Sequence, residues 1–545
     1  MAKPTQLITH LHLIRNKYEA YNTSKKIRLL HSISKQPLKQ TGKKALETYH
    51  DTLVFLLAYP DNKLIHTTAC QSLQQLHTAI RESKRLKTIL YNTGIAGSSI
   101  SAAFSFELVK WLREKEPAAI KINSFDTEDG HIQYILSAVM PKVESEILQD
   151  ANAEWKGWLA AQEIKGNNLL DQLIAIFNST DIRPEVKDEL WNALEMNVEI
   201  NLTRHCVLPE HLIHRHYHRS LISATEKMED IKPIKIKLTD ADAEAIIDAG
   251  RMILVRHLRE IDPVSFTSIR IVDYYQLSRG ISVALMGMVT DRRHPIDSYM
   301  GYVAFKNGLP IGYAGSWILF DSARIGLNIF PSFRGGESQY IFNQVLQLHK
   351  KVYHLKRFTV DPYQIGKENS DGIKSGAFWV YYHAGFRPLL KQKQEIAADE
   401  ALKIKADPRY RTPASTLKKL ADGRMEFILN KNAVQFDAID LSLAWAAILK
   451  KKYNNNRHLI PLDLYKKLAA ILGLKNYHDA NMKFVLQNWS MVLLANEKEL
   501  RSNKTLQRSF KLLFNLKASG KEEEYISVLQ KSVLIRKFIE ALLIH

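Results

Sequence analysis

Apolar residues in the first 240 positions recur three and four apart, which is the spacing of an amphipathic helix. Ile8, Leu11 and Ile14 follow this spacing, and the run 53–57 repeats it. β-Branched residues seldom alternate with polar ones here, so the pattern favours helices over strands. We therefore predict an all-α N-terminal region over residues 1–238, with a loop or minor boundary at 93–99, where the sequence reads TGIAGSS.

The pattern changes at about residue 239. A helix is predicted over 240–259, with Thr239 or Asp240 as its cap, and short apolar strands follow it. The strands 299–306 and 309–320 are joined by Asn307-Gly308, the strongest two-residue hairpin signal in the chain. Further elements are predicted in the order strand, helix, strand, helix, strand, at 323–330, 337–353, 357–360, 374–383 and 385–390, after a first strand at 282–289.

Glycine supports the same division, because 13 of the 23 glycines lie between Gly280 and Gly385. The prediction is a multidomain α + α/β protein. Its central mixed sheet with helices occupies residues 239–405, and an all-α C-terminal region occupies 406–545. A chain of 545 residues with 46% hydrophobic composition is long enough for several packed domains.

The cysteine content and the length of the apolar runs indicate the cellular compartment. Cys70 and Cys206 are the two cysteines, too few for a disulfide framework, and neither belongs to a CxxC pair typical of structural zinc. No apolar run approaches the roughly 20 residues of a membrane-spanning helix, and the first thirty residues lack the apolar core of a signal peptide. We expect a soluble cytoplasmic protein without a membrane span.

The charge is uneven along the chain. The total is +19, with +10 over residues 1–100 and −10 over 101–250. Such alternation suits domains that pack on one another or an anionic cofactor about as well as it suits RNA. Lysine runs such as 450–452 are usually solvated helix faces, although nucleic acid, tRNA or acyl carrier protein stays open as a partner.

One segment carries recognisable chemistry. Residues 329–339 read IFPSFRGGESQ, a strand followed by a glycine turn and a helix. With the order of elements over 299–390, this segment resembles the Gcn5-related N-acetyltransferase (GNAT) superfamily over about residues 240–400. The resemblance implies that backbone N–H groups at the helix start hold the pyrophosphate of acetyl-CoA or another acyl-CoA, since helix N-termini bind phosphate. The cofactor-binding residues implied are Phe330, Arg334, Gly335, Gly336, Ser338, Asn369 and Tyr381.

This sequence departs from the family pattern at the turn. Glu337 and Gln339 stand where the family usually has glycines, which would put a carboxylate near the phosphates. Glu337 would alternatively begin the helix with its side chain turned away from the ligand. A tight turn without any ligand is the simpler alternative.

A second motif lies downstream. Asn369 is followed by a helix that ends in Tyr381, four residues before Gly385-Phe386. The resemblance implies that Tyr381 protonates the departing thiolate, a role that a positioned phenol can fill. The simpler alternative is that the aromatic residues 378–382 belong to a packed core.

The resemblance also implies other catalytic groups. Asn328 would orient the substrate, backbone N–H groups near 328–330 would hold the oxyanion, and a carboxylate or histidine would serve as the base. The base is one of several candidates, and each of them alone is more commonly structural: Glu337, Asp321, Asp361 and His383.

A histidine cluster is the remaining candidate site. His211, His214 and His218 would share one face of a helix begun near Pro209, with His205 and His216 close by in sequence. No glutamate completes an HExxH motif, so a solvated basic face is the better interpretation, and no metal is predicted.

These observations favour a CoA-dependent N-acyltransferase that transfers an acyl group directly to an amine acceptor. The alternative is a catalytically inactive GNAT-like scaffold that binds nucleic acid or a charged carrier, either tRNA or acyl carrier protein. A third possibility keeps the fold and transfers an aminoacyl or carrier-bound acyl group. The sequence does not fix the acceptor, the acyl length or the oligomeric state.

Overall fold

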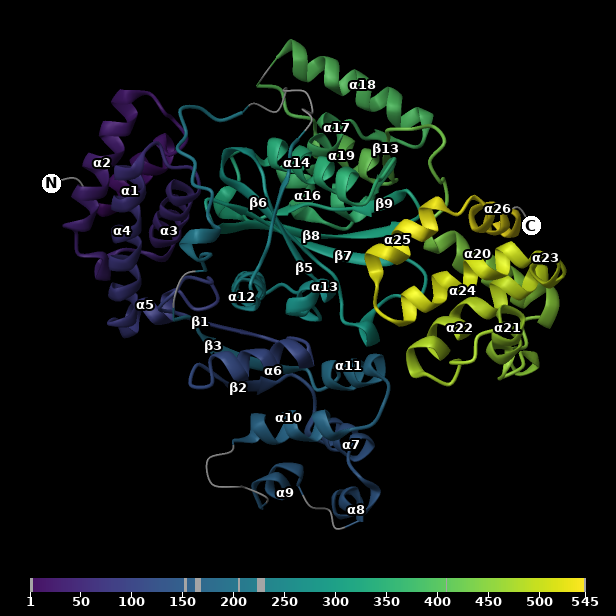
Figure 1. Cartoon of the computed structure of the whole chain (residues 1–545). Helices are drawn as coiled ribbons and strands as arrows, with labels where there is room; N and C mark the ends of the chain where they lie inside the picture. The colour runs from purple at the N-terminus through teal and green to yellow at the C-terminus, as the bar shows by residue number, and fades with distance from the viewer. Residues whose placement is uncertain are drawn as a thin grey trace.

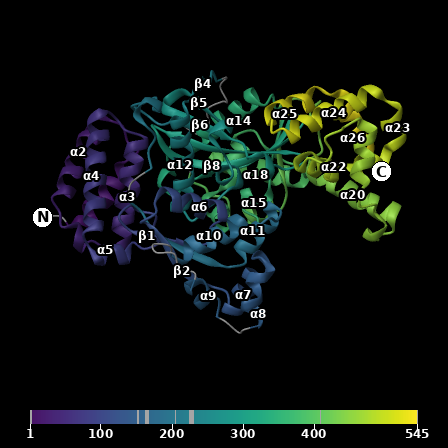
Figure 2. The same ribbon diagram turned by 60° about the horizontal axis from the view of Figure 1, so that its bottom comes forward.

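The computed structural model describes residues 3–150, 154–161, 168–203, 206–222, 231–407 and 409–543. Figure 1 shows a central sheet with the N-terminal helices on one side and the C-terminal helices on the other. A smaller unit of helices and short strands lies below the sheet in that view, and Figure 2 shows the same arrangement after rotation.

Five helices form the N-terminal part of the chain. They are α1 (Pro4–Ile14), α2 (Ala20–Ser34), α3 (Lys43–Ala58), α4 (Lys63–Arg81) and α5 (Lys84–Ile89). Asn62 and Ser83 cap α4 and α5 by accepting hydrogen bonds from backbone N–H groups of the first turn. The helices predicted from the apolar spacing are confirmed over this range.

Residues 99–201 differ from the prediction. They contain the antiparallel sheet β1-β3-β2, made of Ser99–Ala102, Met196–Asn201 and Ile120–Phe125. The prediction of an all-α region over 1–238 is therefore wrong. Each strand has only four to six residues, so the alternation in β3, where Met196, Val198 and Ile200 are buried, is too short to stand out.

The helices of this unit enclose a separate apolar core. They are α6 (Phe106–Lys115), α7 (Asp129–Val139), α8 (Lys142–Asp150), α9 (Trp155–Ala161), α10 (Leu169–Ser179) and α11 (Pro184–Asn192). The core of the N-terminal helices includes Ile95, and the core of this unit begins with Ile100. The boundary between the two apolar cores therefore falls within or next to segment 93–99, where a loop or minor boundary was predicted.

A ten-stranded mixed sheet forms the centre. Its strands are β4 (Ile234–Ile236), β5 (Val272–Gln276), β6 (Ile281–Met286), β7 (Ser298–Lys306), β8 (Leu309–Leu319), β9 (Ser322–Ile325), β10 (Asn328–Ile329), β11 (Arg357–Val360), β12 (Arg387–Pro388) and β13 (Met425–Ile428). The order is β12-β13-β11-β9-β8-β7-β6-β5-β4, with β10 also paired to β8. The predicted β7–β8 hairpin is confirmed, since Asn307 and Gly308 both adopt positive φ at its turn.

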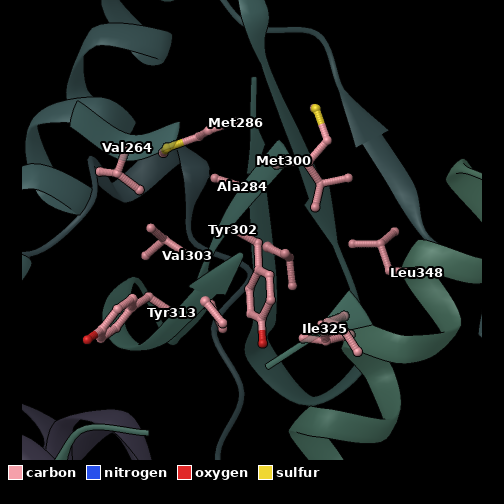
Figure 3. Close-up of a cluster of buried hydrophobic side chains, with 14 of the residues drawn as sticks. Val264, Ala284, Met286, Met300, Tyr302, Val303, Tyr313, Ile325 and Leu348 are labelled. Carbon is pink, nitrogen blue, oxygen red and sulfur yellow. The ribbon is translucent and has the colours of Figure 1, made fainter. Parts of the chain in front are cut away.

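Helices cover both faces of this sheet. α12 (Asp240–Arg256) and the short α13 (Asp262–Ser265) lie on one face, where Val303 and Met286 point toward Val264 (Figure 3). α14 (Ser338–Val352) lies on the other face, where the ring of its His349 packs edge-on against Tyr302 of β7. α14 also connects β9 to β11, which run parallel, so this part has the strand–helix–strand order predicted from the sequence.

The predicted limits of the central domain need correction. β13 pairs with β11 and β12, although it lies beyond residue 405 in the region predicted as all-α. β4 begins before residue 239, and β5 was not predicted at all. Strands of three to five residues leave little periodicity to read.

Two other elements are interrupted. Gly376, with φ +65°, separates α16 (Ser370–Ser375) from α17 (Ala377–His383). The predicted strand 323–330 is broken at Gly326-Leu327 into β9 and β10. The predicted strand 385–390 is reduced to β12.

The C-terminal part is helical apart from β13. Its helices are α18 (Lys391–Ala406), α19 (Ala414–Ala421), α20 (Ala438–Tyr453), α21 (Leu464–Leu472), α22 (Ala480–Leu493), α23 (Glu497–Ser502), α24 (Lys504–Ala518), α25 (Glu522–Lys531) and α26 (Val533–Leu543). Trp489 donates a hydrogen bond to the Pro295 carbonyl, and Gln530 donates to the Tyr353 carbonyl, so this bundle is fastened to the central domain. Among the described residues no helix is both long and apolar enough to cross a bilayer.

Candidate functional site

The central feature of the site is a fork between two parallel strands. β9 and β11 pair over Ser322–Arg324 and Arg357–Thr359, and beyond these residues they part. The chain after β9 stays on β8, because Gly326 donates a hydrogen bond to Gly315 and β10 pairs with Tyr313 and Gly312. A gap in the hydrogen bonding therefore opens on the β11 side of Gly326-Leu327.

The backbone N–H of Leu327 faces this gap. Residues of a strand direct their N–H groups alternately to the two neighbouring strands, and Gly326 is directed to β8. Leu327 donates instead to the hydroxyl of Tyr381, at 3.1 Å. A side chain thus supplies the acceptor that a paired β11 would supply in a continuous sheet.

Tyr381 is held rigidly at the fork. It lies on α17, is 2% exposed, and packs edge-on against Phe342 of α14 and against Phe386. Burial raises the pKa of Tyr381 well above that of a free phenol, so its hydroxyl carries a proton at neutral pH. The hydroxyl can therefore accept from Leu327 and donate to a ligand atom in the fork.

The expectation for the oxyanion donors is corrected for Phe330, whose N–H donates to the Ile311 carbonyl of β8 at 3.0 Å. Asn328 and Ile329 pair with β8, but the alternation of N–H directions along a strand turns the Ile329 N–H away from β8, as it does that of Leu327. Phe330 itself is buried between His257 and Tyr313, with which its ring stacks. The N–H group that donates to Tyr381 belongs to Leu327, which the sequence did not single out, although Gly326 before it is a signal for an irregular strand.

A cavity of about 250 Å³ adjoins the fork on the face of α12 and α13. Gly315 and Gly326 line it from neighbouring strands, whereas Gly301, opposite Gly315, is covered by Pro263. The absence of side chains at Gly315 and Gly326 leaves room for the cavity, although the Tyr299 ring already lies where a Cβ of Gly315 would be.

The structure brings two of the predicted residues to this cavity. Asn328 lines it from β10, and Asp361 lines it from the end of β11. Arg324, Tyr299 and Trp317 line it as well. The carboxylate of Asp361 is thus the candidate base that reaches the fork from the cavity side.

The glycine turn before α14 lies against the N-terminal helices. Arg334 and Gly335 are exposed, and the side chain of Arg15 lies next to Gly335. Gly336 faces Tyr59 at the end of α3, so closely that a Cβ there would lie 2.6 Å from the ring. Ser332 donates a hydrogen bond of 2.7 Å to Asp51 of α3. α3 therefore covers one side of the turn and leaves the edge with Arg334 and Gly335 open.

Glu337 points away from this open edge. Its carboxylate is fully buried, 2.7 Å from the ammonium of Lys306, and it accepts hydrogen bonds from Arg279 and from the Ile222 N–H. Burial alone would raise the pKa of Glu337, but the charges of Lys306 and Arg279 outweigh burial and lower it. Burial also lowers the pKa of Lys306, to about 8.

These contacts do not place Glu337 at the cavity. It makes no contribution to the cavity lining, and its partners belong to the β7 end, the segment 206–222 and α3. The structure thus places Glu337 in a contact between domains, with its side chain turned inward as one sequence alternative had it. The sequence could not show this, because Lys306 and Arg279 are 31 and 58 residues away.

The other predicted site residues lie in different surroundings. Asn369 caps α16 by accepting from Gly372 and donating to Tyr363, so its amide has a local structural role. Ser338 is the first residue of α14 and is half-buried. Asp321 is buried beside Lys356 and accepts from the Val434 N–H, which explains it structurally. His383 is exposed on α17, beside the Trp379 ring.

The histidine cluster does not form a metal site in the described structure. Residues 210–212 form only a single 3-10 turn instead of the predicted helix. His211 contacts Asp242, while His218 is buried next to Arg279, and His205 lies outside the described residues. Within the described ranges no group of three or more His, Cys, Asp or Glu could hold a metal ion.

Comparison with known proteins gives no similarity to report: no family model, no curated protein and no solved structure matches the chain.

Proposed function

We propose that the protein is a CoA-dependent N-acyltransferase in which the fork between β9 and β11 receives the acyl group. The observation that carries this proposal is the hydrogen bond from the Leu327 N–H to the Tyr381 hydroxyl at the point where the strands part. A backbone donor and a protonated phenol side by side, next to a cavity with a carboxylate, are the groups that acyl transfer to an amine requires.

The residues present fit an acyl-CoA in part. The exposed Arg334 and Gly335, with the half-buried Arg15 beside them, form a positively charged edge before α14, which suits a phosphate. The Glu337 carboxylate does not oppose a phosphate there, because it is buried and paired with Lys306 and Arg279. Gly336 is covered by Tyr59 and would not contact the ligand in this conformation.

Acyl-CoA would supply the activated thioester. In the transfer the acceptor nitrogen would bond to the acyl carbon as the bond from that carbon to sulfur breaks. The Leu327 N–H would turn from the Tyr381 hydroxyl to the acyl oxygen, and Tyr381 would donate the proton of its hydroxyl to the leaving sulfur. Asp361 would accept a proton from the acceptor amine, directly or through water.

The packing of Tyr59, at the end of α3, on the glycine turn favours a second candidate function. The Tyr59 ring lies against Gly336, one of the residues that the sequence assigned to phosphate binding. This contact favours a GNAT-like binding protein that takes no CoA and serves as a scaffold for nucleic acid or a charged carrier such as tRNA or acyl carrier protein.

Thermal unfolding with acetyl-CoA, longer acyl-CoAs and free CoA separates these two functions. A ligand at a hundred times its Kd stabilises its domain by about 2.7 kcal/mol, and we expect Arg334→Ala to reduce this gain. Arg409→Ala is the matched control, because the Arg409 side chain is 96% exposed and lies far along the chain from the turn. No stabilisation by any CoA species would contradict the acyltransferase and support the binding protein.

A further inference from the structure

Three side chains above the cavity form a continuous stack. Tyr299 of β7, Trp317 of β8 and Arg324 of β9 stand directly opposite one another in the strand register. The rings of Tyr299 and Trp317 stack at 4.2 Å with an angle of 9° between their planes. The guanidinium of Arg324 lies 4.6 Å from the centre of the Trp317 ring, so the stack fixes its position at the cavity wall.

The Arg324 guanidinium is incompletely satisfied. Its Nε is buried and has no hydrogen-bond partner among the described residues. Asp361 Oδ2 lies 3.4 Å from the same atom, which gives an ion pair but not an aligned hydrogen bond. A buried donor without a partner is destabilising, so a ligand that satisfies this donor would be favoured.

The cavity below the stack limits the size of this ligand. Its volume of about 250 Å³ is smaller than the roughly 300–1000 Å³ of pockets for drug-sized ligands. Its charged groups are the guanidinium of Arg324 and the carboxylate of Asp361. The other polar groups of the lining residues are the amides of Asn328 and Gln364, the hydroxyls of Tyr299 and Tyr363 and the indole N–H of Trp317. A cation and an anion side by side in a small cavity suit a small ligand that carries both charges.

We propose that this cavity binds a small amino-acid-like molecule, with its carboxylate on Arg324 and its amine on Asp361. The planar, fixed guanidinium matches a carboxylate in two parallel hydrogen bonds, which a lysine cannot supply. The carboxylate of Asp361 is one-third exposed and can accept from an ammonium group. This inference rests on the proposed function, because it makes the amino-acid-like molecule the acyl acceptor at the fork.

The test is direct binding to the full chain without any acyl-CoA. Calorimetry would compare alanine, glutamate and phenylalanine with their α-amides and with phenethylamine, which lacks the carboxylate. We expect at least one amino acid to bind and its amide to bind at least tenfold more weakly. Arg324→Gln should abolish the preference for the acid, and Arg324→Lys should weaken binding several-fold while it keeps the charge.

A matched control lies in the C-terminal helices. Arg457 stands over Trp445 at 4.8 Å, the same arrangement as Arg324 over Trp317, but far from the cavity lining. Arg457→Lys should leave binding unchanged. Circular dichroism and the Tm of each variant would show that the Arg324 variants are folded, and Arg324→Lys gives a second, milder substitution.

The inference fails if no amino acid of the panel binds, if amides bind as tightly as acids, or if Arg324→Gln keeps the preference for the acid. It fails separately from the proposed function, because the binding test contains no CoA. Amino acids that bind a protein unaffected by acyl-CoA would support the cavity assignment and contradict acyl transfer. Stabilisation by acyl-CoA without any amino-acid binding would do the reverse.

Discussion

The backbone N–H of Leu327 and the hydroxyl of Tyr381 meet at 3.1 Å across the gap that opens between β9 and β11. One contact therefore closes the edge of a parted sheet and presents a proton donor at the same point. The hydroxyl oxygen of Tyr381 accepts this structural hydrogen bond and also belongs to the proposed acid, so one substitution tests both roles.

Tyr381→Phe removes that oxygen and leaves the Leu327 N–H unpaired. We expect the free energy of unfolding to fall by about 1–3 kcal/mol, the cost of an unsatisfied buried donor. Under the proposed function, acyl transfer should fall by about 10²–10⁴-fold, the contribution of a general acid. Urea unfolding and turnover with an acyl-CoA measure the two effects. Tyr382→Phe, on the same helix, is the control, and equal losses in both variants would remove the special role of Tyr381.

Glu337→Gln tests the buried ion cluster. The change leaves Lys306 and Arg279 without their shared carboxylate, and breaking a buried ion pair costs about 3–5 kcal/mol. Glu244→Gln is the comparison, because Glu244 pairs with Lys115 at an exposed position, where such pairs contribute at most about 1 kcal/mol. Chemical denaturation of both variants measures the difference. Similar small losses would show that the cluster is less important than its burial indicates.

Gly336→Ala tests the packing of α3 on the turn. The new methyl group would lie 2.6 Å from the Tyr59 ring, and overpacking of this kind costs about 1–3 kcal/mol. Gly130→Ala in α7 should not lower stability, since no atom lies within 4 Å of the methyl group that it adds and alanine favours a helix over glycine. The Tm of both variants measures the loss of stability. A Gly336→Ala protein as stable as the wild type would mean that α3 can shift away from the turn at little cost in free energy.

Acid should destabilise the protein through buried histidines. His349 of α14 is fully buried, and burial lowers the pKa of His349 to about 4. Between about pH 6.5 and 4 the unfolded chain binds a proton at this residue and the folded chain does not. Stability is therefore lost as the pH falls through this range, by at most about 3 kcal/mol from His349 alone.

Urea unfolding at pH 7, 5.5 and 4.5 would measure this loss. His349→Gln keeps an N–H donor for the Val345 carbonyl and should flatten the dependence on pH. His10→Gln, at an exposed position of α1, should leave it as in the wild type. Parallel curves for all three proteins would show that His349 does not take part.

The elements that the sequence predicted well are those with strong local signals. The Asn307-Gly308 hairpin and α14 have a turn dipeptide and four turns of apolar spacing. β1, β4 and β13 are too short for periodicity, and their pairing partners lie up to 102 residues away, as for Ser99 and Asn201. Nothing local distinguishes such segments from loops.

Site residues could be predicted from the sequence only where their position depends on the order of elements along the chain. Tyr381 and Asp361 stand at the ends of their elements, and the structure places both at the fork or its cavity. Leu327 could not be found, because its role depends on which strand its N–H faces. Arg324 depends likewise on the register that aligns it with Trp317. Glu337 was misplaced because its cationic partners are distant in sequence.

The amide of Asn307 donates to the carbonyl of Ala58, 249 residues earlier in the chain, at the contact that joins the β7–β8 hairpin to the end of α3. Ribosomes add about 5–20 residues per second, so the N-terminal helices leave the exit tunnel roughly 10–50 s before their partner is made. During that time Tyr59, and the face that later covers the glycine turn, are uncovered. The contact between the end of α3 and the β7–β8 hairpin can therefore form only after synthesis has passed residue 307, well after α3 itself can fold.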